Sequence, residues 1–169
     1  GDAPELILSN SIFGDGSAAC LLTNRKDKTG LRIVDFESKI VTHHRDTLRF
    51  RTENARLRNV IKEAVAGIAA ELTREIAQIL LKKHRFKQHD IKFWALHPGG
   101  RKVLDRVQKE MHLKATDLDY SRRVLYNYGN MSSPTVLYVL KEILKDKMLG
   151  KGDLILMASF GAGFSGYAA

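Results

Sequence analysis

Two short loops carry side chains that are suited to stabilising negative charge. His97 lies in "HPGG" and Asn130 lies in "YNYGNMSSP". Each side chain can donate a hydrogen bond to an oxygen atom, and Gly99 and Gly100 would let a substrate approach the backbone closely. Two such donors together would suit a developing enolate or oxyanion. From these residues alone, two structural turns, with Ser133 capping the next helix, remain open as the alternative.

The first half of the chain has strand-like and helix-like apolar patterns. Residues 17–23, "SAACLLT", and 31–36, "LRIVDF", are short apolar runs bounded by glycines, which predicts an antiparallel pair of strands. Between about Glu53 and Lys83 apolar residues recur at helical spacing without a proline. This pattern predicts one long helix, or two helices joined near Gly67.

The second half alternates strands with helices. The run "IKFWAL" predicts a buried strand that ends at His97, and the spacing of Val103, Leu104 and Val107 predicts a helix after it. A second amphipathic helix is expected over 136–148, and the C-terminus reads as a strand, a glycine turn and a strand. The alternation indicates a single layered α/β domain, with helices packed on a mixed sheet.

Composition limits the classes of function. The chain has 169 residues, of which 44% are hydrophobic, and no apolar run reaches the length of a membrane helix. The first residues do not resemble a signal peptide. The net charge of +9 favours anionic partners, such as nucleic acid, phosphate-bearing thioesters or an acidic carrier protein. The charges are interspersed, as on solvated helix faces, and no zinc-finger spacing or aromatic RNA-binding signature is present.

The single cysteine, Cys20, lies in the apolar run "SAACLL", where we expect a buried and inert thiol. Cys20, His97 and Asn130 follow the chain order of papain-like cysteine proteases. In that class the cysteine should open a helix, which the run around Cys20 does not predict. A basic module that binds a partner without catalysis is the other alternative.

Four motifs in one order carry a resemblance to a known family. They are "SIFGDGSAACLL", "FWALHPGGRKVLDRV", "YNYGNMSSPTVLYVL" and "SFGAGFSGYAA". Together they resemble the C-terminal half of thiolase-superfamily condensing enzymes, and are most similar to the chalcone synthase-like type III polyketide synthases. The closing motif is more similar to ketoacyl-carrier-protein synthase III, which remains the alternative branch. The resemblance covers residues 1–169 as one C-terminal chalcone/stilbene synthase-like domain. It implies half of the duplicated thiolase fold, with a five-stranded mixed sheet.

The resemblance also implies a function and a set of site residues. In this family a cysteine on the N-terminal half, which this chain lacks, carries an acyl group. The C-terminal half binds a malonyl thioester, whose decarboxylation precedes Claisen condensation, and its histidine and asparagine match His97 and Asn130. Ser132 resembles a position that lines the acyl pocket. The stretch Gly161, Ala162 and Gly163 resembles the glycine-rich loop beside the nucleophile, although a proline is frequent at the position of Ala162. Asn59 or Val60 stands where a gatekeeping phenylalanine is expected.

The implied partners are acyl-CoA and malonyl-CoA, the missing N-terminal half of the same polypeptide, and a second copy in a homodimer. No metal or other cofactor is expected, nor a membrane or nucleic acid partner. The resemblance implies a cytoplasmic acyltransferase, and this chain by itself is expected to be inactive.

Overall fold

The computed structural model describes residues 7, 11–25, 30–53 and 55–169. The described elements alternate between short strands and helices, as the sequence predicts for an α/β domain. In chain order they are β1 (Glu37–Ile40), η1 (Thr42–His44), β2 (Leu48–Glu53), β3 (Arg56–Ile61), α2 (Val65–Lys83), η2 (Gln88–Asp90), β4 (Ile91–Leu96), α3 (Arg101–Glu110), η3 (Ala115–Leu118), α4 (Asp119–Tyr128), α5 (Pro134–Leu144), β5 (Leu154–Gly161) and β6 (Ser165–Ala168).

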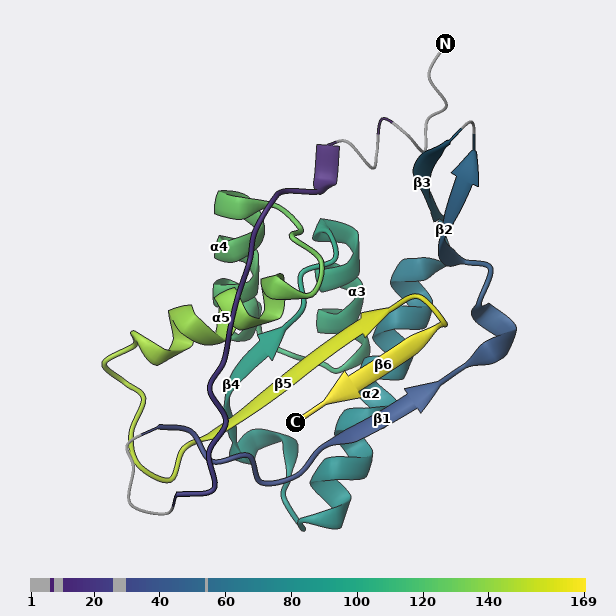
Figure 1. The fold of residues 1–169 in the computed structure, drawn as a ribbon. Coiled ribbons are helices and arrows are strands. Elements are labelled where there is room, and N and C mark those ends of the chain that lie inside the picture. Colours follow the sequence, from purple (N-terminus) through teal and green to yellow (C-terminus); the bar gives the residue numbers. More distant parts are fainter. Residues whose placement is uncertain (1–6, 8–10, 26–29, 54) are drawn as a thin grey trace.

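The main sheet is mixed and has the order β1-β6-β5-β4 (Figure 1). The pair β4 and β5 is parallel, whereas β5 with β6 and β6 with β1 are antiparallel. Within the described residues this sheet has four strands rather than the five expected, and β2 and β3 form a separate two-stranded hairpin. The parallel pair is the part that matters for the site, because β4 ends directly before His97.

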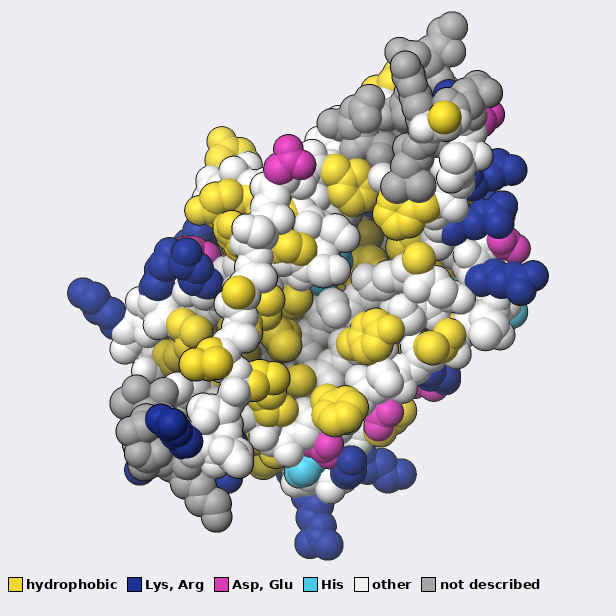
Figure 2. Space-filling view, in the orientation of Figure 1, with side chains coloured by type: hydrophobic (Ala, Val, Ile, Leu, Met, Phe, Trp, Pro, Cys, Tyr) yellow, Lys and Arg dark blue, Asp and Glu magenta, His cyan; other side chains and the backbone are white. Residues whose placement is uncertain are grey.

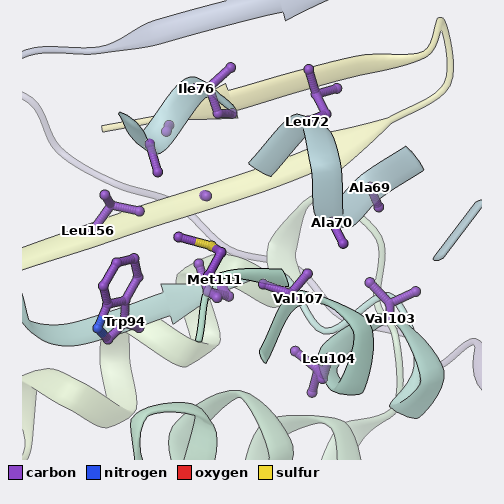
Figure 3. Close-up of a cluster of buried hydrophobic side chains, with 14 of the residues drawn as sticks. Ala69, Ala70, Leu72, Ile76, Trp94, Val103, Leu104, Val107, Met111 and Leu156 are labelled. Atoms are coloured by element: carbon purple, nitrogen blue, oxygen red, sulfur yellow. The ribbon is translucent and has the colours of Figure 1, made fainter. Parts of the chain in front are cut away.

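Helices pack on both faces of the sheet, so the expected layered arrangement is confirmed. Alternate residues of β4 point to opposite faces, as the two-residue period of a strand requires. Trp94 and Leu96 join a cluster with α2 and α3 (Figure 3), whereas Phe93 and Ala95 join a second cluster with α4 and α5. Figure 1 shows α2 behind β1, β5 and β6. The end of β4 is therefore fixed by packing from both sides.

The predicted antiparallel pair at 17–23 and 31–36 is wrong for this structure. Neither run is part of a strand, and Cys20, expected to be buried, is exposed. Leu21 is 92% exposed and Phe36 is 72% exposed. A strand needs a partner for its backbone groups, and no described strand pairs with these runs. Their apolar side chains contribute to the hydrophobic surface on the face shown in Figure 2.

The predicted helix from Glu53 is wrong over its first twelve residues or so, because α2 begins only at Val65. The preceding residues form the hairpin of β2 and β3, which turns at Ala55 with a φ of 56°. Val60 and Ile61 lie on a strand, but their spacing also fits the helical pattern of α2. The apolar pattern therefore placed the start of the helix too early in the sequence. The remaining part, α2, is a single helix that passes through Gly67 without a break.

Sequence reasoning also missed α4, since residues before Gly129 were assigned to a loop. The helix contains Ser121 and Val124, both fully buried, at a spacing of three residues. Strongly exposed residues such as Tyr126, at 91%, dilute its apolar face. The predicted strand ending at His97, the helix after it, and the C-terminal pair of strands are all confirmed.

Candidate functional site

His97 follows the last residue of β4 and is almost buried, with 8% of its surface exposed. Its backbone N–H donates to the carbonyl of Ala158 on β5, at 2.8 Å, which extends the parallel pairing by one residue. Its ring meets the ring of Phe160 edge to face, with centroids 5.2 Å apart. Burial lowers the pKa of His97 from 6.5 to about 4 because the charged form loses its solvation. His97 is therefore a neutral imidazole at neutral pH.

Asn130 is positioned by the end of α4 and by a neighbouring segment. Gly129 ends α4 with a φ of 70°, a conformation that glycine adopts readily. The backbone N–H of Asn130 donates to the carbonyl of Ile12 at 2.8 Å, and its carbonyl accepts from the N–H of Gly14 at 3.0 Å. A Cβ atom on Gly14 would lie 2.2 Å from the carbonyl oxygen of Tyr128, so only glycine allows this approach.

The side chain of Asn130 connects the two loops. Its Nδ2 donates to the carbonyl of Gly99 at 3.2 Å, and its Oδ1 accepts from the backbone N–H of Ser132 at 2.9 Å. Asn130 is 6% exposed. Because Gly99 lies two residues after His97, this bond brings the two loops together at the same end of the sheet.

Both side chains keep donor capacity. Nδ2 of Asn130 carries two N–H groups, and the bond to Gly99 uses one of them. Within the described residues, no group forms a hydrogen bond with the imidazole nitrogens of His97. Neither nitrogen is fully buried, so neither is a buried polar atom without a partner. One N–H of each side chain is thus not used by a hydrogen bond within the described residues.

The predicted substrate-binding residues lie around this pair. Gly100 precedes α3 as its N-cap residue, and Gly99 packs so closely on Phe160 that a Cβ atom would lie 2.7 Å from that ring. Ser132 is exposed and has a φ of 63°, which a non-glycine residue rarely adopts. Ser133 occupies the N-cap position of α5 but makes no capping hydrogen bond through its side chain.

In the stretch from Gly161 to Gly163, Gly161 ends β5, and Ala162 and Gly163 lie in the turn to β6. In this turn the hydroxyl of Ser165 donates to the carbonyl of Ala162 at 3.0 Å. The turn follows directly after Phe160, the residue whose ring touches His97. It is therefore joined to the histidine through one aromatic contact.

The structure also places the expected gatekeeper position and Cys20. Asn59 and Val60 lie on β3, opposite Phe50 and Arg49. Cys20 lies in a stretch with neither helix nor strand. The helix N-terminus that a papain-like nucleophile requires is therefore not present at Cys20.

Sequence reasoning missed Phe160 and Ser121. Phe160 stacks on Phe164 at 6.0 Å and closes one side of the His97 ring. Ser121 is fully buried on α4 and donates its hydroxyl to the carbonyl of Leu96 at 2.7 Å. A small polar residue on the apolar face of a helix was the available signal for Ser121.

In the part of the chain that the structure covers, no three His, Cys, Asp or Glu side chains lie together as a metal ion would require. Among the same residues, no helix is both long and apolar enough to cross a bilayer.

Comparison with known proteins places this geometry in a family. The profile of the chalcone and stilbene synthases, C-terminal domain, matches residues 38–165. Type III polyketide synthase A of Arabidopsis thaliana is 32% identical over 165 residues, which cover 89% of this chain and 39% of the relative. The 3,5-dihydroxyphenylacetyl-CoA synthase of Amycolatopsis balhimycina is 29% identical over 157 residues, which cover 91% of this chain and 42% of the relative.

Solved structures agree with the sequence comparison. The 1,3,6,8-tetrahydroxynaphthalene synthase of Streptomyces coelicolor A3(2), a bacterial type III polyketide synthase, superposes with a TM-score of 0.88 at 25% identity. The match covers 96% of this chain and 46% of that chain, so the expected thiolase-like fold is confirmed. The chain spans less than half the length of these relatives. It belongs to the chalcone and stilbene synthase family and corresponds to the C-terminal domain of its members.

Proposed function

We propose that this chain is the C-terminal half of a condensing acyltransferase that decarboxylates a malonyl thioester and extends an acyl thioester by Claisen condensation. The observation that carries the proposal is the pair of available donors. His97 is kept neutral by burial. The side chain of Asn130 donates a hydrogen bond to Gly99, in the loop that follows His97. The proposed substrates are malonyl-CoA and an acyl-CoA, and the proposed oligomer is a homodimer of the whole protein.

Decarboxylation breaks the bond between the carboxylate and the α-carbon, and carbon dioxide leaves. The electron pair stays on the α-carbon and is delocalised onto the thioester oxygen. Two N–H donors fixed in a site that excludes water stabilise the negatively charged oxygen of the transition state more strongly than the neutral oxygen of the ground state. The resulting carbanion attacks the carbonyl of an acyl group on a cysteine of the other half. A carbon–carbon bond forms, and the thiolate leaves as the carbon–sulfur bond breaks.

The other half is also the proposed cover for the exposed apolar surface. Leu21, Leu22, Ile33 and Phe36 are each at least 60% exposed, which is unusual for large apolar side chains that lie in one region of the sequence. A shallow groove lies beside Phe36 and Tyr167 and is also lined by residues 157–159 of β5. Sedimentation of this chain alone should therefore show self-association. Co-expression with the N-terminal half should replace it with a defined complex.

The test of the proposal is a set of variants in the full-length enzyme. His97→Ala and Asn130→Ala should each cost about 2.7–4 kcal/mol in transition-state stabilisation, since each removes one donor to the oxyanion. Decarboxylation of malonyl-CoA should fall together with condensation. His89 and Asn127 are exposed residues of the same types, so His89→Ala and Asn127→Ala are matched controls that should keep the wild-type rates.

Two further outcomes decide between alternatives. Cys20→Ala should leave turnover unchanged, and a loss of turnover would contradict the assignment of the nucleophile to the other half. Offering the malonyl group on a carrier protein instead of CoA tests the ketoacyl-carrier-protein synthase III type. This chain without its N-terminal half should form no polyketide, because it offers no activated thiolate.

A further inference from the structure

We propose that Ser121 is a positioning residue for His97: its hydroxyl holds the end of β4 and so fixes where the imidazole lies relative to Asn130. The inference deepens the proposed function and rests on it. Ser121 itself lies on α4 and touches the carbonyl of Leu96, not the reacting atoms.

The carbonyl of Leu96 needs a partner that the sheet does not supply. In the parallel pairing, the backbone N–H of His97 points toward β5 and donates to Ala158. Backbone groups of successive strand residues alternate between the two sides of a strand. The carbonyl of Leu96 therefore points to the outer edge of β4, where the described sheet ends. A buried carbonyl without a hydrogen bond would cost about 1–3 kcal/mol.

Ser121 supplies this partner from α4. It is 0% exposed, and its Oγ lies 2.7 Å from the carbonyl oxygen of Leu96. Leu118, directly before α4, and Val124, on α4, are also fully buried, one in each of the two hydrophobic clusters. The hydroxyl is thus held by packing and is not a mobile surface group. Apart from this bond, an alanine would suit the position as well.

The bond belongs to a pair that brackets the histidine. Before His97, the carbonyl of Leu96 accepts from Ser121, and after it the carbonyl of Gly99 accepts from the amide of Asn130. Both donors come from α4 or from the residues that follow its end. The helix therefore holds the loop of His97 on both sides and sets its position relative to Asn130.

The consequence is specific to His97. If the carbonyl of Leu96 is released, the loop keeps the bond from His97 to Ala158 and the bond from Asn130 to Gly99 but loses its anchor to α4 before the histidine. Water should then gain access to the imidazole. Burial alone accounts for the low pKa of His97, and no charged side chain of the described residues contributes to it. Added hydration should therefore raise this pKa, and a displaced N–H should stabilise the thioester oxygen less well.

The experiment compares Ser121→Ala, which removes the hydroxyl, with Ser121→Thr, which retains it. Ser133→Ala is the matched control, because Ser133 is exposed and makes no capping bond with its side chain. The titration of the His97 ring is followed by NMR in this chain, and the spectrum of His97→Gln identifies its signal among the six histidines. Urea unfolding establishes that each variant is folded.

We expect Ser121→Ala to raise the His97 pKa by about one unit or more. In the full-length enzyme it should lower kcat for malonyl-CoA decarboxylation by about tenfold or more, with little change in KM. Ser121→Thr and Ser133→Ala should remain close to the wild type in both measurements. A folded Ser121→Ala variant with an unchanged His97 titration would overturn the inference and leave Ser121 a purely structural residue.

The titration separates this inference from the proposed function. If the wild-type full-length enzyme does not decarboxylate malonyl-CoA, the proposed function fails. A shift of the His97 pKa in Ser121→Ala would still support the positioning role. If the enzyme is active and Ser121→Ala shifts neither the pKa nor kcat, the proposed function stands and the positioning role fails.

Discussion

The buried, neutral state of His97 predicts a loss of stability at acidic pH. Burial lowers the pKa of this imidazole from 6.5 to about 4. Between these values the unfolded chain binds a proton that the native chain does not bind, so the free energy of unfolding decreases as pH falls. The difference of about 2.5 units, at about 1.4 kcal/mol per unit, gives a loss of about 3 kcal/mol that is complete only below about pH 4.

The variant His97→Gln isolates this contribution, because glutamine does not titrate. Trp94 is the single tryptophan and is 2% exposed on β4, three residues before His97, so its fluorescence reports unfolding near the site. Urea unfolding between about pH 7 and about pH 4 should show a loss that is smaller by about 3 kcal/mol in His97→Gln than in the wild type.

Carboxylates also contribute to acid sensitivity, and the comparison removes them. Lys83, and then His84, lower the pKa of Asp35, and Lys92 lowers that of Asp153. These groups are the same in both proteins, so their effects cancel in the difference. The imidazole of His89 is exposed, and His89→Gln should follow the wild-type curve. Parallel curves for His97→Gln and the wild type would refute the claim that His97 is desolvated and neutral.

Three further predictions concern packing and exposure. Gly67→Ala should raise the free energy of unfolding by about 0.5–1 kcal/mol, because Gly67 is inside α2 and a Cβ atom there meets no atom within 4 Å. Gly166→Ala should lower it by about 1–3 kcal/mol, since its Cβ atom would lie 2.6 Å from Cγ of Leu72. Both free energies are measured by urea unfolding. The same change in both variants would contradict the difference in space around the two glycines. Cys20 is exposed, so a thiol reagent should modify one group per native chain without added denaturant.

The sequence predicted best those elements whose own residues mark where they begin and end. The strand that ends at His97, the helix α3 and the hairpin of β5 and β6 were found because their apolar residues and glycines mark both the period and the boundary. The runs 17–23 and 31–36 have the same strand-like composition. They do not form strands here, because a run becomes a strand only where another strand accepts its hydrogen bonds.

The site was predicted by residue type but not by contact. His97 and Asn130 could be chosen as donors from their chemistry and from the family resemblance, whereas the bond from Asn130 to Gly99 depends on where α4 ends. That helix was itself missed, so Ser121 had no place in the sequence prediction. Phe160 was missed because its role depends on a contact that the sequence does not show. Its contact with His97 joins two parallel strands that lie far apart in the sequence.

The contacts that place the two donors are made within this chain. Every hydrogen bond described here that holds Asn130 comes from this chain, through Ile12, Gly14, Gly99 and Ser132. The ring of His97 is likewise buried against Phe160 of the same chain. The proposed condensing function needs a thiolate from elsewhere, whereas the residues that hold the donors belong to this chain. The pKa of His97 and its dependence on Ser121 can therefore be measured in this chain alone, before any turnover is reconstituted.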